Sequence, residues 1–507
     1  MDTASQSEVV AFLADPASHG GAAVERIDTH ISSLFLTGSS VFKLKKAVRL
    51  PFLDFSTLAA RKAACDAELA INRAATPGLY VGLRVVTRDG DRLRFDGDGT
   101  VLDWVVEMHR FDQADRFDLL LAAGRIDRDL IYALTEAIAA FHRTQPARPD
   151  KGDAAALAWV IATNRATMLA QVPDIFAAAA VDELAEASTA ALARLTPVLE
   201  ARRKTGKVRW CHGDLHLGNL CLFEGRPALF DALEFSEDLA CIDVFYDLAF
   251  LLMDLDHRGA RRMASWVMNH YLDLTGDYQG LEPLPLFLSS RAAIRAHVCA
   301  TMAATQAGEA RNRLAEEART YLAQAAAYLS PPPARLLAVG GLSGSGKSRM
   351  ARELSPYLGI PGAAVVRTDS LRKQLMGVGI HDRLGPEGYT AEVTERTYDA
   401  LYDTVTRLLA AGHAVVADAV FARPEQRAAI ADIARAAAVR FDGVWLDTPP
   451  DLAAARIRTR RANISDATPE VLDRQRAYDL GPITWIRIDS SPPKDITLAA
   501  GRAALGV

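Results

Sequence analysis

The sequence lacks the features that mark several classes of protein. Its 507 residues include five cysteines, which are far apart and show no C-x-x-C spacing, so neither a disulfide framework nor a zinc site is expected. No apolar run reaches membrane-spanning length, and the first residues show no basic and apolar signal pattern. A formal net charge of -5 gives no field that would attract nucleic acid. We therefore expect a cytoplasmic protein that binds neither membrane nor nucleic acid.

The apolar content is high enough for more than one hydrophobic core. With 50% hydrophobic residues over 507 positions, the chain is expected to form two to four domains. Three consecutive prolines, Pro331 to Pro333, cannot continue a helix and mark the clearest boundary. We predict an N-terminal helical segment (1–26), a first domain (27–330, with a small lobe at about 27–110 and a helical large lobe at about 111–330), a Pro-rich linker (331–334) and a second domain (335–507).

The second domain opens with a phosphate-binding pattern. The segment from Gly341 to Ser348 fits G-x-x-x-x-G-K-[ST], the Walker A pattern, and follows an apolar run at 336–339 that is typical of a strand. A glycine-rich turn is the alternative, which a preceding strand and a following helix disfavour. Lys347 is expected to reach the outer phosphates of ATP and Ser348 to ligate Mg²⁺. The predicted ATP-binding residues of this loop are Gly341, Ser343, Gly344, Ser345, Gly346, Lys347 and Ser348.

The rest of the second domain alternates strands and helices. Strand patterns at 363–367, 413–417, 439–446 and 484–488 predict an α/β fold with a parallel sheet. Ligands bind such sheets at the carboxyl ends of the strands, where Asp369 and Asp418 fall.

The first domain begins with a hairpin and a helix. Strand patterns at 31–36 and 41–45 flank a turn, and helical spacing at 56–75 includes Glu68. A strand lysine that pairs with a helix glutamate is what a kinase-type small lobe needs to contact ATP phosphates. Lys43 and Lys45 lie on the same face of the strand, so the choice between them stays open, and a solvated surface lysine is the alternative.

A polar constellation follows in the middle of the chain. Asp214, Asn219 five residues later, and Asp231 at the end of the next apolar strand supply the groups that phosphoryl transfer requires. One carboxylate accepts the proton of the attacking hydroxyl, while an amide oxygen and a second carboxylate hold Mg²⁺. The alternative is a polar hairpin between two buried strands.

This run resembles the catalytic loop of the aminoglycoside phosphotransferase and choline kinase-like family, which carries H-G-D-x-x-x-x-N. The resemblance implies a bilobal α+β domain of the protein-kinase type. A single glycine, Gly38, stands where protein kinases have three. The roles implied are Asp214 as the catalytic aspartate, Asn219 and Asp231 as metal ligands, Lys43 as the phosphate-contacting lysine and Glu68 as its partner.

Acidic residues continue after Asp231. The family resemblance implies that Asp247 supports the catalytic loop, whereas a lining for a cationic substrate is the alternative. The roles of Glu234 and Glu237 stay open.

The second domain resembles the small P-loop kinases that include gluconate kinase, polynucleotide 5′-hydroxyl kinase and the zeta-type toxins. The resemblance implies that Asp369 activates an acceptor hydroxyl, that Arg372 binds the acceptor and that Asp418 is a carboxylate of the Mg²⁺ site. Basic residues of a lid, among them Arg456 and Arg460, would neutralise charge on the γ-phosphoryl group. A solvated helix face is the alternative for these arginines.

Together these patterns predict a bifunctional aminoglycoside phosphotransferase-like and ATP-binding protein. Each domain would transfer the γ-phosphate of ATP, with Mg²⁺, to a hydroxyl group of a small molecule such as a sugar, an amino sugar or an amino alcohol. One alternative is a single active kinase that is regulated by a nucleotide-binding P-loop domain. Another is a P-loop half that acts as a polynucleotide 5′-hydroxyl kinase. The acceptor and the oligomeric state stay open.

Overall fold

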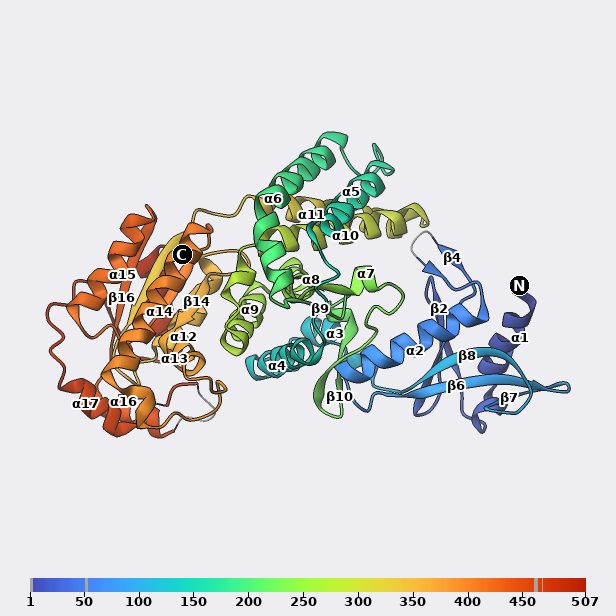
Figure 1. The fold of residues 1–507 in the computed structure, drawn as a ribbon, viewed down its shortest axis with the longest axis horizontal. Helices are drawn as coiled ribbons and strands as arrows, with labels where there is room; N and C mark the ends of the chain where they lie inside the picture. The colour runs from blue at the N-terminus through green and yellow to red at the C-terminus, as the bar shows by residue number, and fades with distance from the viewer. Residues whose placement is uncertain (1–2, 51–52, 460–463, 467) are drawn as a thin grey trace. The chain divides into compact units, whose positions relative to one another are not determined.

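The computed structural model describes residues 3–50, 53–459, 464–466 and 468–507 (Figure 1). The chain forms two compact units, each described by itself: Met1–Leu157 with Leu199–Leu251, and Ala158–Val198 with Leu252–Val507. The Pro-rich linker predicted at 331–334 lies inside the second unit, and the domain boundaries proposed from the sequence remain predictions.

The first unit begins with an antiparallel six-stranded sheet. Its order is β1-β2-β3-β8-β6-β7. The strands are β1 (Glu25–Asp28), β2 (Ser32–Leu36), β3 (Ser40–Lys45), β6 (Tyr80–Asp89), β7 (Arg92–Phe95) and β8 (Thr100–His109).

Alternation along β3 assigns its two faces to two different helices. Phe42 and Leu44 pack with Val9 and Leu13 of α1 (Thr3–Ala14). Val41 faces the other way, into the core that α2 (Leu58–Ala75) covers. Since side chains alternate along a strand, the two lysines of β3 point toward α2 with Val41.

Two short antiparallel pairs flank the catalytic-loop segment in the chain. β9, just before it, pairs with β12, and β10, just after it, forms a hairpin with β11. The remaining elements of the first unit are η1 (Pro16–His19), β4 (Arg49–Leu50), β5 (Leu53–Asp54), η2 (Gln113–Asp115), α3 (Phe117–Ala122), α4 (Arg128–Thr144), β9 (Val208–Trp210), η3 (Leu217–Asn219), β10 (Leu220–Phe223), β11 (Arg226–Leu229), α7 (Glu237–Ala240) and β12 (Cys241–Asp243).

Long helices make up the first part of the second unit, and three of them, α5, α6 and α8, begin or end in the first. α10 and α11 pack against one another along their lengths. The helices are α5 (Ala154–Leu169), α6 (Ala178–Lys204), α8 (Val244–His257), α9 (Arg261–Thr275), η4 (Tyr278–Leu281), α10 (Leu284–Ala304) and α11 (Gly308–Leu329). No helix among the described residues is long and apolar enough to cross a membrane.

The second unit ends in a parallel five-stranded sheet of order β14-β15-β13-β16-β17. Alternate residues of the central strand, Leu337 and Val339, pack with Met350 of α12 and Leu505 of α18. The strands are β13 (Arg335–Gly340), β14 (Ala364–Arg367), β15 (Val415–Asp418), β16 (Arg440–Asp447) and β17 (Ile486–Asp489). The helices are α12 (Lys347–Leu354), η5 (Ser355–Tyr357), α13 (Thr368–Leu375), η6 (Pro386–Tyr389), α14 (Ala391–Ala410), α15 (Pro424–Ala436), α16 (Pro450–Arg458), α17 (Pro469–Arg476) and α18 (Lys494–Leu505).

The fold class predicted from the sequence is confirmed. A kinase-like region with an N-terminal sheet precedes an α/β region with a parallel sheet, and all five strands expected there are present. β1 and β7 were not predicted from the sequence.

Candidate active sites

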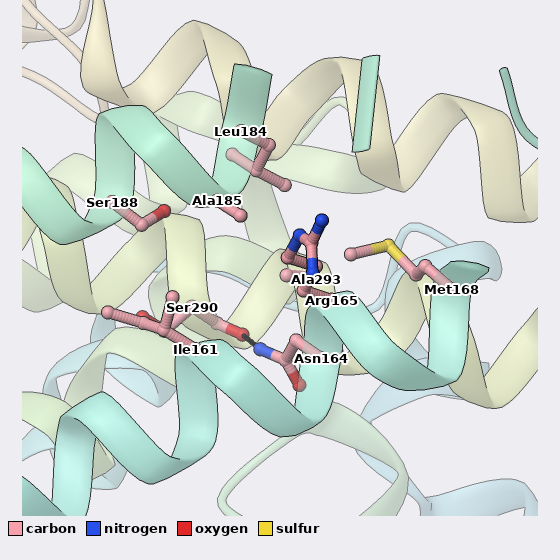
Figure 2. A pocket seen from close by; sticks show the side chains of 9 residues that line it. All are labelled: Ile161, Asn164, Arg165, Met168, Leu184, Ala185, Ser188, Ser290 and Ala293. Atoms are coloured by element: carbon pink, nitrogen blue, oxygen red, sulfur yellow. Dashed lines mark hydrogen bonds between the residues drawn. The ribbon is translucent and has the colours of Figure 1, made fainter. Parts of the chain in front are cut away.

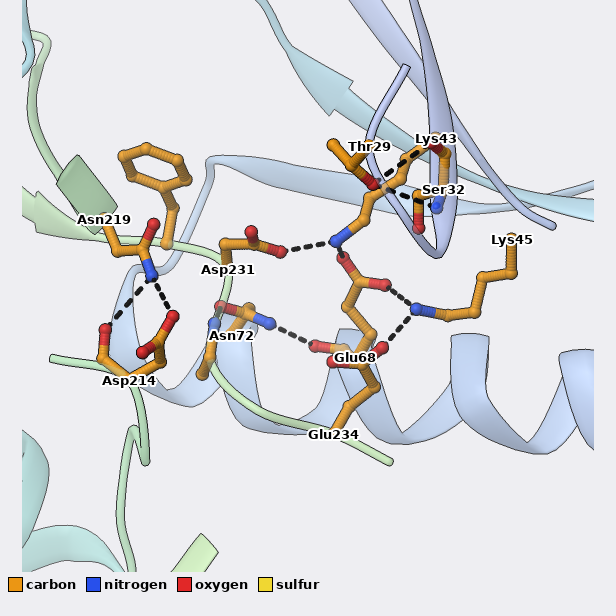
Figure 3. A network of polar contacts seen from close by, with 12 residues as sticks. Thr29, Ser32, Lys43, Lys45, Glu68, Asn72, Asp214, Asn219, Asp231 and Glu234 are labelled. Carbon is orange, nitrogen blue, oxygen red and sulfur yellow. Dashed lines mark hydrogen bonds and ion pairs between the residues drawn. The ribbon is translucent and has the colours of Figure 1, made fainter. Parts of the chain in front are cut away.

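A buried ion-pair network joins the strand lysines to the catalytic-loop segment (Figure 3). Lys43 Nζ lies 2.7 Å from Glu68 Oε1 and 2.5 Å from Asp231 Oδ1. Lys45 Nζ lies 2.6 Å from Glu68 Oε2 and also pairs with Glu234. Asp231 is 49% exposed, whereas the side chains of Lys45 and Glu68 are fully buried. Lys43 therefore lies at the solvent-accessible end of the network. Lys45 lies at the buried end and holds Glu68 there through an ion pair.

Glu68 is the shared anion of this network. Burial alone would raise the pKa of its carboxyl, but the ammonium groups of Lys43 and Lys45 outweigh burial and lower this pKa to about 2. Although burial disfavours its charged form, the pKa of Lys43 is raised because Asp231 and Glu68 surround it. Glu68, Lys43 and Lys45 are thus ionised together at neutral pH.

Polar residues spaced by four along α2 fix the backbone on both sides of Asp231. Asn72 donates to the Glu68 carbonyl oxygen at 2.9 Å and accepts from the Ala232 N–H at 3.0 Å. Thr76 Oγ1 bonds both the carbonyl oxygen and the N–H of Leu229, at 2.8 and 2.9 Å. Glu68 and Asn72 share one face of α2, and Thr76 follows as the residue that caps the helix; this spacing by four is the signal by which the sequence could have revealed the two anchors.

Asp231 itself has an unusual backbone conformation. Its φ is 60°, in the left-handed region that aspartate tolerates better than most residues. Its N–H donates to the hydroxyl of Tyr80 at 2.9 Å. Tyr80, which the sequence did not indicate as a site residue, therefore supports this turn from β6.

The catalytic loop brings Asp214 and Asn219 together. Asn219 Nδ2 donates to Asp214 Oδ2 at 2.9 Å and to its carbonyl oxygen at 3.0 Å. The side-chain nitrogen of Asn219 faces Asp214. The side-chain oxygen, Oδ1, is therefore the atom of Asn219 that could bind a cation. Together with the Asp231 carboxylate it offers the oxygen donors that Mg²⁺ prefers, so this pair could hold that ion.

Asp247 supports the catalytic loop by accepting hydrogen bonds from its backbone. Its two oxygens accept the N–H groups of His212 and Gly213 at 3.1 and 2.8 Å, just before Asp214. His142 Nε2 lies 3.0 Å from the same carboxylate, which is fully buried. These contacts favour the supporting role expected for Asp247 over a substrate lining.

His216 is a neighbour of Asp214 that the sequence did not single out. Its Nδ1 accepts the N–H of Gly218 at 3.0 Å, so the neutral ring carries its proton on Nε2. That nitrogen lies 3.4 Å from Asp214 Oδ2. His216 can therefore orient the carboxylate without being charged.

The P-loop has the backbone geometry of a phosphate cradle. Gly341, Gly344 and Gly346 all have positive φ, at 140°, 84° and 94°. A Cβ at Gly344 would lie 2.5 Å from the Ala453 carbonyl oxygen, so a side chain has no room there. The hydroxyl of Ser345 is buried without a hydrogen-bond partner among the described residues. These features fit a loop whose N–H groups turn toward an anion.

Three N–H groups of the loop already have partners within the protein. The N–H groups of Gly341 and Ser345 donate to the carbonyl oxygens of Val420 and Leu342, each at 3.2 Å. Ser343 N–H donates at 2.8 Å to Gln475 Oε1 from α17. Lys347 Nζ lies 3.4 Å from the Leu342 carbonyl oxygen. A cavity of about 100 Å³ lies between this loop, the end of β16 and the helices α16 and α17.

The residues predicted to act on the acceptor lie near the ends of β14 and β15. Asp369 is half-buried in the first turn of α13. Arg372 Nη1 donates to the Gly388 carbonyl oxygen at 2.8 Å, and its guanidinium lies 4.9 Å from the ring centre of Tyr389. Asp418 Oδ2 accepts from Arg367 Nε at 3.1 Å.

The lid residues are placed in part. Arg456 Nη2 donates to the Ser490 carbonyl oxygen at 2.7 Å, so it lies against the loop after β17. Arg460 lies outside the described residues. Asp466, just after that segment, lies 3.2 Å from Lys373 Nζ and accepts from the Tyr389 hydroxyl at 3.1 Å. Asp466 is thus tied to the acceptor side of the sheet.

A further, much smaller cavity of about 10 Å³ lies between α5, α6 and α10 (Figure 2). Across it, Asn164 Nδ2 donates to the Ser290 carbonyl oxygen at 3.4 Å. None of the residues predicted for either site lines it, so it is not an active-site candidate.

Comparisons with known proteins match the two regions separately. Residues 59–284 match the family model described as phosphotransferase enzyme family, and residues 336–479 match the one described as AAA domain. Uncharacterized proteins of Mycobacterium tuberculosis and Mycobacterium bovis are each 28% identical over 480 residues, which is 92% of this chain and 92% of theirs.

Two solved structures resemble separate parts of the chain. A choline/ethanolamine kinase family protein from Mesorhizobium loti is 14% identical and covers 64% of this chain and 95% of its own, with a TM-score of 0.42. The APS kinase of Mycobacterium tuberculosis is 22% identical and covers 35% of this chain and 99% of its own, with a TM-score of 0.27.

Proposed function

Because this chain is an ATP-dependent phosphotransferase that joins a phosphotransferase-family domain to a P-loop kinase-like domain, we propose that each domain phosphorylates a hydroxyl group of a small molecule. Both resemblances noted in the sequence are thereby confirmed at the level of the family. One observation carries the proposal: Asp214, Asn219, Asp231 and Lys43 converge in one site while the glycine conformations of a phosphate loop are kept in the other.

In the first site, Asp214 accepts the proton of the attacking hydroxyl. The Asn219 amide and the His216 ring orient its carboxylate toward the acceptor. Asn219 and Asp231 would hold Mg²⁺, which when bound neutralises charge on the transferring phosphoryl group. We assign the phosphate contact to Lys43 rather than Lys45, because Lys43 alone of the two is bonded to Asp231.

In the second site, the segment from Gly341 to Ser348 binds the phosphates of ATP through its N–H groups and Lys347. Asp369 orients the acceptor hydroxyl, and Arg372 contacts the acceptor next to Tyr389. Ser348 and Asp418 would hold Mg²⁺ there. Because the two domains are fused in one chain, we further propose that the two sites act on one substrate or on consecutive intermediates.

The test is transfer of labelled γ-phosphate from ATP into fractionated metabolites by wild type, Asp214→Asn, Lys347→Ala and Asp369→Asn. Separate labelled products that vanish in separate variants are expected, and they would identify the acceptors. If Asp214→Asn alone abolishes labelling, the P-loop half is a regulator and the bifunctional proposal is wrong. Unrelated acceptors for the two sites would contradict the shared-substrate proposal alone.

A further inference from the structure

A buried polar stripe on α9 meets the P-loop region. Ser265, Asn269 and Asp273 are spaced by four residues, and all three are buried. They lie within the segment that the phosphotransferase family model matches, yet they belong to the same compact unit as the P-loop sheet. In Figure 1, α9 lies beside α12 and β14, and residues of these elements are in contact.

The middle of the stripe completes the edge of the sheet. β14 is the edge strand, and Asn269 Oδ1 accepts the N–H of Val365 at 2.7 Å. Asn269 Nδ2 donates to the carbonyl oxygen of Ala363 at 3.2 Å. A side chain from α9 thus replaces the neighbouring strand that this edge lacks.

The end of the stripe reaches the carboxyl end of β14. The Asp273 carboxylate accepts from Arg352 Nη2 at 2.6 Å and from the hydroxyl of Ser370, and Arg367 Nη1 lies 3.5 Å away. The three partners come from α12, β14 and α13. A carboxylate in the last turn of a helix opposes the helix dipole, so α9 by itself would be more stable without Asp273. The arginines offset this cost.

Arg367 is shared between two carboxylates. Its Nε donates to Asp418 Oδ2 at 3.1 Å, and the two residues are register partners on neighbouring strands. Arg367 is 1% exposed, and its Nη2 has no partner among the described residues. Without the charge of Asp273, Asp418 would be the carboxylate that still forms an ion pair with this buried cation. Their pairing would then tighten and withdraw Asp418 from a metal ion.

We propose that Asp273 is a positioning residue of the P-loop site. Asp273 shares the Arg367 guanidinium with Asp418. The pairing between Arg367 and Asp418 is therefore weaker, and Asp418 stays available for Mg²⁺. Asp273 also holds Ser370, so that the first turn of α13 presents Asp369 to the acceptor. The proposal rests on the nucleotide-binding function proposed above for the P-loop half, and it means that this site is completed by a helix outside residues 335–507.

Hydrogen exchange in the full-length chain separates the two ATP sites, because protection is measured peptide by peptide. At a fixed concentration of a non-hydrolysable ATP analogue, protection of the peptide spanning 341–354 is followed as Mg²⁺ is added. Asp273→Asn is expected to raise the Mg²⁺ concentration for half protection about tenfold, as loss of a group behind a metal ligand does. Asp273→Glu keeps the charge and is expected to restore most of the affinity.

The matched control is Arg262→Gln on the same helix. Arg262 pairs with Glu353 of α12 at 2.7 Å but does not reach the arginine beside Asp418. Its replacement is expected to change the Mg²⁺ requirement by less than about twofold, since its side chain is exposed. If Asp273→Asn and Arg262→Gln give the same Mg²⁺ requirement, the effect of Asp273 is packing and the proposal is wrong.

A second variant addresses the other contact and covers the case in which Asp273→Asn does not fold. Ser370→Ala removes one hydroxyl without changing charge. Measured as ATP hydrolysis in an Asp214→Asn background, it is expected to lower P-loop turnover about tenfold with an unchanged Mg²⁺ requirement. Wild-type turnover would overturn the positioning of α13. If Lys347→Ala leaves the protection of 341–354 unchanged, the P-loop binds no ATP, and the proposed function fails together with this inference.

Discussion

The two candidate sites differ in the parts of the chain that build them. The phosphotransferase-family site is made of side chains from distant segments: Lys43 and Asp231 are 188 positions apart and meet at 2.5 Å. The proposed P-loop cradle lies within eight consecutive residues, and the positive φ of Gly341, Gly344 and Gly346 sets the direction of its backbone. The first site therefore depends on charge balance in a buried network, whereas the second depends on backbone conformation.

The largest expected effect concerns the side-chain site. Asp214→Asn is expected to lower phosphoryl transfer by the first site about 10³-fold, because a general base is lost while the hydrogen bond from Asn219 can persist. Labelled phosphate in the product measures the loss. Asp238→Asn, an exposed acid after the same loop, serves as control and should retain full activity. Equal activity of the two variants would remove Asp214 from the mechanism.

The second prediction tests whether charge balance stabilises the same site. Lys45→Met is expected to lower the free energy of unfolding by about 3 kcal/mol, because Glu68 and Glu234 lose a buried partner. Urea unfolding at neutral pH measures it, with Lys62→Met as the exposed control. Adding Glu234→Gln should recover part of the loss. A cost below about 1 kcal/mol for Lys45→Met would show that the network is not held by charge.

The third prediction compares the glycines of the two nucleotide loops. Gly344→Ala is expected to weaken ATP binding to the P-loop about tenfold, because φ is positive and the added Cβ would meet the Ala453 backbone. Gly38→Ala, in the hairpin of the other site, is expected to change stability by less than about 0.5 kcal/mol, since a Cβ there meets no atom within 4 Å. Titration calorimetry and urea unfolding provide the two measurements. If Gly344→Ala binds ATP as tightly as wild type, the P-loop site does not depend on backbone conformation in the way proposed.

The smallest expected effect is a pH dependence of the first unit. The folded-state pKa of Glu68 is lowered from 4.5 to about 2, so its contribution to stability is present above pH 4.5 and is lost as the pH falls toward 2. Between pH 5 and pH 4 the loss should stay below about 1 kcal/mol. Unfolding free energies of wild type and Glu68→Gln over this range measure it. An identical slope in both would contradict the role of Glu68.

The sequence predicted the P-loop region well because its signals are local. Five apolar runs predicted the five strands, and one contiguous motif predicted the phosphate loop. β1 and β7 were missed for a physical reason. All four residues of β1 are exposed, and β7 packs only two half-buried residues, Leu93 and Phe95, against the core, so neither strand carries a fully buried apolar face.

The first site was predicted only in part. The spacing of Asp214, Asn219 and Asp231 indicated the catalytic loop, but strand alternation could not separate Lys43 from Lys45. In the structure the two lysines differ in their second ion-pair partner, which is Asp231 for Lys43 and Glu234 for Lys45.

The supporting residues were missed because their partners are remote in the sequence. Asn72, Thr76 and Tyr80 bond a segment more than 150 positions away, and Asp273 bonds residues of another matched region.

The amino-acid sequence by itself determined the class of the chemistry, two kinase-type regions, since the motifs of both are short and each is read within a few dozen residues. Only the tertiary structure decided which lysine faces the site, which residues fix the loop around Asp231, and that α9 completes the edge of the P-loop sheet. These features depend on contacts between distant segments, and such contacts form only when burial of apolar surface brings the segments together.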